Sequence, residues 1–295
     1  MTPATPHSTD LYRGRFAPSP TGPLHLGSLL TALASYLDAR RAGGQWLLRM
    51  EDIDPPREPP GAADAILGCL DTHNLHPDAP VLYQHTRSAA YDRALDSLEA
   101  QGLLFSCTCT RRELGPGGAC AGRCSTAAPA DRPAALRVRV TGEVEACFTD
   151  LVQGEQSLRD TEVAQDFVVR RKDGLYAYQL AVVVDEAFQG ITHVIRGMDL
   201  LPTTFQQCYL QRALGLPRPA YGHIPVITDT RGNKLSKQNR AAAADPGTPL
   251  ANLTRLLTLL RQPVPDADTP QALLEQATRC WDRDALRGLE RIVDS

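Results

Sequence analysis

Strands and helices alternate in the first third of the sequence, and this order restricts the chain to few folds. Leu11–Ala17 predicts a short strand, and a loop rich in proline and glycine leads from it into a helix over Ser28–Arg41, where leucine and alanine recur at helical spacing. A second strand is predicted over Gln45–Met50, followed by helices over Gly61–Asn74 and Ser88–Gln101. Because such alternation is typical of parallel sheets with helices on both faces, we expect a doubly wound α/β fold.

The alternation is interrupted in the middle of the sequence. From Cys107 to about Gln165 the sequence contains a glycine-rich segment, polar turns and short alternating strands such as Leu136–Val140. We interpret this stretch as an insertion in the α/β unit. The pattern then returns in Asp166–Arg171, Ala177–Asp185, Ile191–Arg196, a helix from about Pro202 to Leu214, and the strand Ile224–Thr228.

The two ends of the sequence are predicted to lie outside the α/β unit. Ala241–Pro249 has the composition of a linker, and helices are predicted beyond it over Leu253–Leu260 and about Asp282–Val293. The first ten residues are rich in proline, threonine and serine and lack the apolar core of a signal peptide. No apolar run is long enough for a membrane span. We expect a frayed amino-terminal tail on a cytoplasmic protein.

Composition and net charge say little about which molecules the protein binds. The length of 295 residues suits one large domain or two smaller ones, and 42% hydrophobic residues allow a sizeable core. The formal net charge of −3 argues against indiscriminate binding of nucleic acid, but it is compatible with a local basic patch.

Two separate loops carry residues suited to phosphate chemistry. The first, Arg15–Ser28, contains prolines that fix its path and glycines that let a ligand approach the backbone. His25 and Ser28 stand where this loop enters the predicted helix, and backbone N–H groups at such a junction favour anions. The second loop, Lys234–Lys237, offers two ammonium groups. Together the loops indicate nucleotidyl transfer at the α-phosphate of ATP; the alternative is a proline-rich turn and an exposed basic loop that share no function.

Four cysteines in the insertion have the spacing of metal ligands. Cys107, Cys109, Cys120 and Cys124 form the pattern C-x-C-x₁₀-C-x₃-C, which predicts one tetrahedral zinc ion. No histidine or open position is evident in the pattern, so the zinc would be structural. A disulfide pair or uncommitted thiols are the alternatives. The other four cysteines are scattered, and we expect them to be reduced residues of the core or surface.

Several further motifs give the two loops a specific resemblance. His25–Ser28 and Lys234–Gln238 resemble the two ATP-binding elements of class I aminoacyl-tRNA synthetases. The surrounding sequence resembles the glutamyl branch of that class. The motifs that carry this second resemblance are Arg15–Gly22, Met50–Asp54, Asp173–Gln179, Val182–Asp185 and Val194–Gly197. The resemblance extends from about Tyr12 to Asn239 and implies a Rossmann-type catalytic domain.

The resemblance also implies which residues bind the two small substrates. ATP would be bound by Pro18, Ser19, His25, Gly27, Ser28, Lys234 and Lys237. Among these, His25, Lys234 and Lys237 would be catalytic, and Mg²⁺ would accompany the nucleotide. L-Glutamate would be bound by Arg15, Phe16, Ala17, Pro18, Ser19, Glu51, Tyr178 and Arg196.

The charges of the residues explain which part of glutamate each would bind in the pocket that the resemblance implies. Arg15 and Arg196 would meet the side-chain carboxylate through bidentate contacts. Glu51 would meet the ammonium, together with oxygens of Ala17 and Ser19. Two arginines suit glutamate better than glutamine. Without the resemblance, Arg196 could be a surface arginine at a strand end, and Glu51 a helix cap or an ion-pair partner.

The remaining polar residues are interpreted as structural. His73, His76, His85, His193 and His223 are scattered, and we expect them to be structural or solvated. Asp52 and Asp54 resemble a catalytic pair, but the proposed chemistry needs no general acid there. We therefore expect them to anchor a loop.

The sequence after the second loop distinguishes two branches of the family. Only 58 of the 295 residues follow Lys237, whereas an anticodon-reading domain needs roughly 100 or more. The chain therefore resembles the glutamyl-Q tRNA(Asp) synthetases, the short relatives of glutamyl-tRNA synthetases. That resemblance implies activation of glutamate without tRNA and its transfer to queuosine in the anticodon of tRNA(Asp), by a monomer with no membrane attachment.

Two other functions stay open from the sequence. One is an enzyme that charges the 3′ end of tRNA(Glu), and the other is an inactive synthetase-like binding module. The expected units are a flexible tail (1–10), the first half of a catalytic Rossmann domain (11–105), an inserted zinc-containing subdomain that binds the anticodon stem-loop (106–165), the second half with the lysine loop (166–239), and a linker with C-terminal helices (240–295).

Overall fold

A parallel sheet forms the centre of the protein in the computed structural model, which describes residues 11–115, 118–120, 124, 132–141, 147–157, 165–229 and 244–293. Strands β1 (Arg13–Phe16), β2 (Gln45–Met50) and β3 (Leu82–Tyr83) pair in parallel, as do β9 (His193–Gly197) and β10 (Ala220–Ile224). The amide of Thr192 donates to the carbonyl of Arg13 at 2.9 Å and joins the two groups. The strand order is therefore β3-β2-β1-β9-β10, as in a doubly wound sheet.

Helices separate these strands along the chain. They are α1 (Leu26–Arg41), α2 (Ala62–Thr72), α3 (Ser88–Ala100), α4 (Tyr178–Gln189) and α5 (Leu201–Ala213). Short 3₁₀ turns cover Pro55–Arg57, Gln84–Arg87 and Met198–Leu200. None of the helices in the described ranges is both long enough and apolar enough to cross a membrane.

Helix α1 forms because its apolar residues recur on one face and its ends are well defined. Leu29, Leu33 and Leu37 are fully buried, and the His25 side chain caps the first turn by accepting from the Ser28 amide. After the helix, the chain turns tightly into β2. A Cβ on Gly44 would lie 2.2 Å from the Tyr12 carbonyl oxygen, so only glycine fits where β2 begins beside β1.

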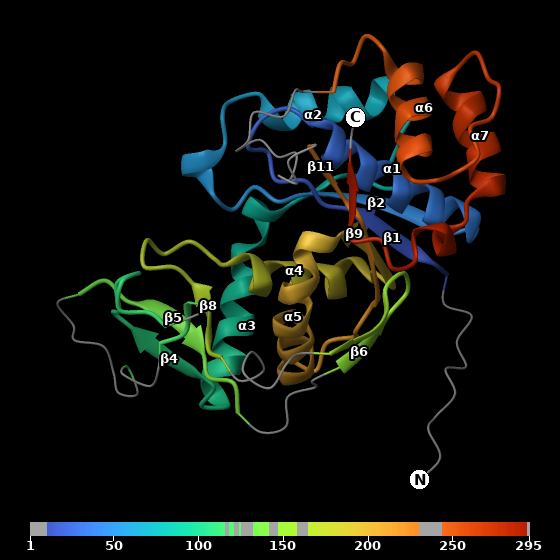
Figure 1. The fold of residues 1–295 in the computed structure, drawn as a ribbon. Helices are drawn as coiled ribbons and strands as arrows, with labels where there is room; N and C mark the ends of the chain where they lie inside the picture. Colours follow the sequence, from blue (N-terminus) through green and yellow to red (C-terminus); the bar gives the residue numbers. More distant parts are fainter. Residues whose placement is uncertain are drawn as a thin grey trace.

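The interruption in the middle of the sequence forms a second, antiparallel sheet. Strands β4 (Leu104–Cys107), β5 (Ala135–Val138) and β8 (Phe167–Arg170) have the order β4-β5-β8 and pack on α3 and α4. Figure 1 shows them at the far end of the molecule from the C-terminal helices. The segment Asp166–Arg171 was expected in the returning α/β unit, but it pairs with β5 because its apolar residues, including Phe167, complete that core.

A hairpin connects this sheet to the parallel one. Strands β6 (Cys147–Asp150) and β7 (Gly154–Ser157) pair antiparallel, and Phe148 packs its ring against Phe205 and Tyr221. The amide of Leu151 donates to the carbonyl of Tyr221 at 2.7 Å. The hairpin therefore lies against β10, and Val152 in its turn is buried in the core beneath the parallel sheet.

The C-terminal region contains two helices and a strand. Helices α6 (Pro249–Leu259) and α7 (Pro270–Cys280) pack on α1, as Figure 1 shows. The helix predicted over Asp282–Val293 is wrong: the segment forms a 3₁₀ turn, Arg283–Leu286, and strand β12 (Arg291–Val293). The strand forms because its backbone pairs in parallel with β11 (Val226–Thr228), a partner that sequence periodicity does not reveal.

Candidate active site and metal centre

A cavity of about 440 Å³ lies where the strands of the parallel sheet end. Arg15 and Phe16 close β1, Arg196 lies near the end of β9, and Glu51 directly follows β2. The cavity brings together all the predicted substrate residues that the structure describes: Arg15, Phe16, Ala17, Pro18, Ser19, His25, Gly27, Ser28, Glu51, Tyr178 and Arg196. This is the edge at which doubly wound sheets bind ligands. Lys234 and Lys237 lie outside the described residues.

The proline-rich loop forms one wall of the cavity. The Glu51 amide donates to the Pro18 carbonyl at 2.9 Å and fixes the loop to the end of β2. Gly22 has φ 135°, which a residue with a side chain rarely adopts. His25 Nδ1 accepts from the Ser28 amide, and its Nε2 lies 3.0 Å from the Ser28 hydroxyl. The loop therefore holds the imidazole at the amino-terminal end of α1, where anions are favoured.

Four buried charges beside this loop alternate in sign. Arg15 Nη2 lies 3.0 Å from Glu186 Oε1, and Arg49 Nη2 lies 3.1 Å from Glu51 Oε1 and 3.8 Å from Glu186 Oε1. Burial raises the pKa of Glu51, and the charges of Arg49 and Arg15 oppose that rise. Arg49 and Glu186 were not predicted from the sequence. A signal for Glu186 was present, because a carboxylate inside an apolar helix is seldom buried without a partner.

Arg196 differs from these charges because no carboxylate in the described ranges forms an ion pair with it. Only 1% of the residue is exposed. Its Nε donates to His223 Nε2 at 3.0 Å, its Nη2 donates to Thr204 Oγ1 at 2.6 Å, and its Nη1 lies 3.4 Å from the Tyr178 hydroxyl. A buried cation with only neutral direct partners is costly unless an anion arrives. This side chain is therefore suited to binding a carboxylate.

His223, one of the histidines expected to be structural or solvated, contacts this arginine. It is fully buried, and its Nδ1 lies 2.6 Å from Asp150 Oδ2. Neither Asp150 nor Thr204 was singled out from the sequence. Asp150 lies on the hairpin, outside every motif, and Thr204 lies in α5, which begins shortly after the Val194–Gly197 motif.

A second and wider cavity opens beside the first. It measures about 1140 Å³ and shares Ser19, Glu51 and Tyr178 with the smaller cavity. From there it extends along the antiparallel sheet to Cys107 and Lys172. Because the two cavities share lining residues, an open space leads from the candidate glutamate pocket to the insertion.

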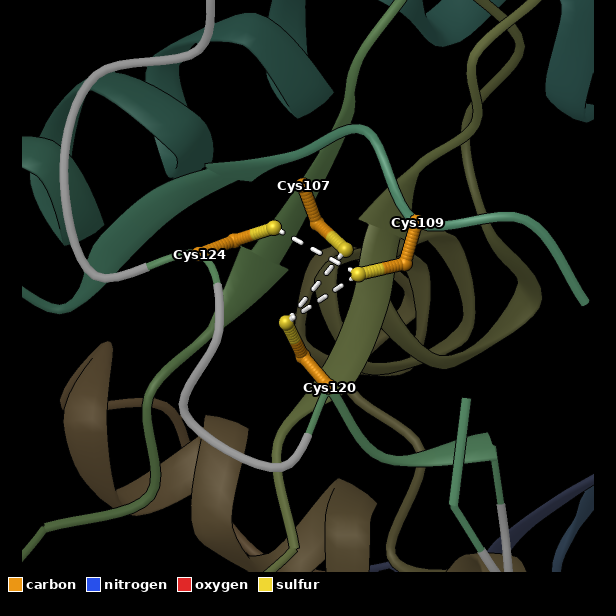
Figure 2. Close-up of side chains that lie close together, drawn as sticks. All are labelled: Cys107, Cys109, Cys120 and Cys124. Atoms are coloured by element: carbon orange, nitrogen blue, oxygen red, sulfur yellow. Dashed lines mark hydrogen bonds between the residues drawn. The ribbon is translucent and has the colours of Figure 1, made fainter. Parts of the chain in front are cut away.

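The four predicted metal ligands come together at the end of this wider cavity. Their sulfur atoms all lie within 4.8 Å of one another. The Sγ–Sγ distances are 3.6 Å for Cys107–Cys120, 3.7 Å for Cys109–Cys120 and 3.5 Å for Cys109–Cys124. Four sulfurs about 2.3 Å from a tetrahedral zinc ion would lie about 3.8 Å apart. Figure 2 shows the side chains converging, and the four residues therefore fit a zinc ion.

Neighbouring residues hold the backbone around this cluster. Lys172 Nζ donates to the carbonyls of Thr108 and Cys109 at 2.6 and 2.8 Å. The Cys120 amide donates to Asp166 Oδ1 at 2.9 Å, and Asp166 also pairs with Arg137. Such contacts set the direction of the ligands before a metal binds.

Asp52 and Asp54 anchor a loop, and the sequence-based expectation for them is confirmed. Asp52 accepts hydrogen bonds from the amide and the ring of His85. Asp54 pairs with Arg57 and, at 3.0 Å, with Arg171. The two carboxylates are engaged with different partners.

The fold and this site agree with comparisons with known proteins. A family described as "tRNA synthetases class I (E and Q), catalytic domain" matches residues 12–117 and 122–248. The chain belongs to this family. It is therefore an enzyme of the ligase class, and the prediction of a Rossmann-like α/β fold is confirmed.

Individual relatives extend the comparison over most of the chain. A glutamyl-Q tRNA(Asp) synthetase of Dechloromonas aromatica (strain RCB) is 52% identical over 266 residues, which are 87% of this chain and 88% of the relative. Another, of Acinetobacter baylyi (strain ATCC 33305 / BD413 / ADP1), is 46% identical over 275 residues, 93% of this chain and 94% of the relative. Among solved structures, the chain resembles a glutamate tRNA ligase from Elizabethkingia meningosepticum CCUG26117, crystallised in complex with its amino acid. The two share 26% sequence identity and superpose with a TM-score of 0.78. The match covers 96% of this chain and 67% of that chain.

Proposed function

We propose that this enzyme activates L-glutamate with ATP in the absence of tRNA and transfers it to queuosine in the anticodon of tRNA(Asp). The observation that carries the proposal is Arg196, a buried guanidinium in a 440 Å³ cavity with no carboxylate paired to it in the described ranges. The names of the relatives supply the acceptor: glutamyl-Q tRNA(Asp) synthetases at about half identity cover most of this chain.

Glutamate fits the charges around the cavity. Its side-chain carboxylate would bind the terminal N–H groups of Arg196, with Arg15 of the neighbouring strand β1 also lining the cavity. Its ammonium would bind Glu51, together with oxygens of Ala17 and Ser19. Glutamine would leave the Arg196 charge without an anion, so the site would reject it.

The chemical step needs electrostatic stabilisation more than acid–base catalysis. The α-carboxylate of glutamate attacks the α-phosphate of ATP, the bond from that phosphorus to the bridging oxygen breaks, and pyrophosphate leaves. Negative charge accumulates on the phosphoryl oxygens during this step. His25 and the amides at the start of α1 would stabilise it from one side, and Lys234 and Lys237 from the other. Mg²⁺ would accompany the ATP phosphates.

The insertion would hold the RNA. The wider cavity leads from the shared residues Glu51 and Tyr178 to the cysteine cluster, so an acceptor bound there would face the carbonyl of the activated glutamate. Cys107, Cys109, Cys120 and Cys124 would hold one zinc ion, which cross-links the segments that carry them. The stem-loop-binding subdomain, expected over 106–165, would be built on the antiparallel sheet, whose strands begin at Leu104 and end at Arg170.

Transfer of labelled glutamate tests the proposal directly. The enzyme, ATP and Mg²⁺ would be incubated with tRNA(Asp) that carries queuosine and with the same tRNA without it. Label on the queuosine form alone supports the proposal. Label on the 3′ end of tRNA(Glu) would show a charging enzyme instead, and absence of any glutamate-dependent exchange between ATP and pyrophosphate would show an inactive module.

A further inference from the structure

Arg196 belongs to a chain of buried groups that continues away from the cavity. Asp150 ends strand β6, His223 lies in β10, and Arg196 lies in β9. Their exposed fractions are 2%, 0% and 1%. Asp150 Oδ2 lies 2.6 Å from His223 Nδ1, and His223 Nε2 lies 3.0 Å from Arg196 Nε. Three elements thus place a carboxylate, an imidazole and a guanidinium in series behind the candidate glutamate pocket.

The backbone fixes the carboxylate end of this series. Asp150 Oδ1 accepts hydrogen bonds from the amides of Val152 and Gln153 at 2.9 Å and of His223 at 3.0 Å. Burial alone would raise the pKa of Asp150, but these bonds and the contact with His223 outweigh it and hold the pKa below its usual value. Asp150 is therefore an ionised acceptor whose second oxygen faces the His223 ring.

The carboxylate in turn determines the tautomer of the imidazole. An ionised Asp150 accepts only, so His223 Nδ1 carries the hydrogen and Nε2 keeps its lone pair. Burial lowers the pKa of His223, and the Arg196 charge lowers it further against the opposing effect of Asp150. The ring is consequently neutral and can accept the Arg196 Nε–H.

The imidazole then orients the guanidinium. With Nε engaged by His223 and one Nη2 hydrogen engaged by Thr204, rotation of the Arg196 fork would break two hydrogen bonds. Even counting the long contact with Tyr178, two of the five N–H groups of Arg196 have no partner among these residues. Those two belong to the terminal nitrogens, which is the arrangement that a bidentate carboxylate requires.

We propose that Asp150 and His223 are positioning residues for glutamate, which hold Arg196 with its terminal N–H groups directed at the substrate's side-chain carboxylate. The inference rests on the proposed function, because it assumes that Arg196 binds glutamate. Neither residue touches the substrate, and neither exchanges a proton in the reaction. Their effect is confined to glutamate binding and does not extend to ATP.

Two substitutions of His223 separate this role from simple packing. In His223→Gln the amide oxygen can take the place of Nε2 and accept from Arg196, whereas in His223→Asn the shorter side chain reaches only Asp150. We expect His223→Asn to raise the KM for glutamate about 10- to 100-fold in ATP–pyrophosphate exchange, the value of a hydrogen bond to a charged group. We expect His223→Gln to raise it less than about 3-fold, with the KM for ATP unchanged in both.

Asp150→Asn provides an independent test that keeps the backbone hydrogen bonds. The asparagine oxygen can still accept from the amides, but its NH₂ group would donate to His223 Nδ1. The ring hydrogen would then move to Nε2 and oppose the Arg196 Nε–H. We therefore expect a glutamate-specific rise in KM like that of His223→Asn, in a protein whose melting temperature shows that it is folded.

A double-mutant comparison with Arg196→Met distinguishes the possible failures. If His223 acts through Arg196, adding His223→Asn to Arg196→Met raises the KM no further. An equal fold-change in both backgrounds, or no change for His223→Asn alone, would overturn the positioning role and leave the proposed function standing. Absence of glutamate-dependent exchange in the unmodified enzyme, or a normal KM for glutamate in Arg196→Met, would overturn the assignment of Arg196 and this inference with it.

Discussion

Arg49 and Arg196 are both fully buried arginines, and their surroundings predict opposite consequences for the same substitution. Arg49 contacts the carboxylates of Glu51 and Glu186, whereas Arg196 contacts a histidine, a threonine and a tyrosine. Methionine keeps an unbranched apolar stem but is shorter and carries no charge. We expect Arg49→Met to impair stability and Arg196→Met to impair binding of glutamate.

The expected change in the free energy of unfolding depends on the partner groups that remain after each arginine is removed. Arg49→Met leaves Glu51 buried without its arginine, and breaking such a pair costs about 3–5 kcal/mol of unfolding free energy, which lowers the melting temperature by roughly 6–20 °C. Arg196→Met leaves Thr204 Oγ1 and His223 Nε2, which lie 3.2 Å apart and can bond to each other. The free energy of unfolding should then change by less than about 1 kcal/mol.

For glutamate binding we expect Arg196→Met to have the larger effect of the two substitutions. Loss of the Arg196 contact to a buried carboxylate costs about 2–5 kcal/mol, so the KM for glutamate should rise about 30- to 4000-fold. Thermal unfolding with and without glutamate provides a second measurement. Saturating glutamate at about 100 times its Kd stabilises the unmodified enzyme by about 2.7 kcal/mol, and this gain should disappear in Arg196→Met.

One result would refute this reasoning. If Arg196→Met destabilises the free enzyme as much as Arg49→Met does, Arg196 is a structural residue whose charge is compensated within the protein. A normal response to glutamate in Arg196→Met would place the substrate carboxylate elsewhere.

Three further predictions concern the metal, the lysine loop and acid. Elemental analysis should find one zinc per chain, lost in Cys107→Ser; a zinc-free native protein would contradict the metal site. Lys237→Ala should slow adenylate formation with little change in melting temperature, and normal exchange rates would exclude Lys237 from the mechanism. The KM for glutamate should rise in acid, because a protonated His223 presents an N–H to Arg196. The pKa of His223 is lowered by burial, so this rise should begin only below the ordinary histidine value of about 6.5. In His223→Gln this rise should be absent, and its persistence there would assign it to another group.

The sequence located the parts of the site that are encoded locally. Arg15–Ser28 is one continuous segment between a strand and a helix, so its residues share a wall of the cavity whatever the rest of the chain does. Arg196 and Glu51 were predicted from the resemblance to a known family, and the fold brings them together because strand ends of a parallel sheet meet at one edge. Contacts between distant segments were not found: Arg15 and Glu186 are 171 residues apart, and Asp150 and His223 are 73 apart.

In the C-terminal region, too, secondary structure that depends on distant segments could not be predicted from the sequence. Helix α7 falls within the expected C-terminal helices, but its bounds were not predicted, although Thr269 and Pro270 are a recognisable start, with the Thr269 hydroxyl accepting from the Ala272 amide. Strand β12 could not be inferred in the same way, because its formation depends on pairing with β11. A short segment without alternation gains its conformation from the neighbour that it meets.

This pairing also connects the chain's last described residues to the candidate nucleotide side of the site. Ile292 pairs with Ile227, and Val226 and Ile227 line the cavity. At the opposite end of α1, Asp38 accepts from the Trp281 indole at 2.8 Å and from the Tyr12 hydroxyl at 2.6 Å. The C-terminal region therefore contacts both the strand that precedes the lysine loop and the helix whose amino end would face the phosphates of ATP in the proposed function.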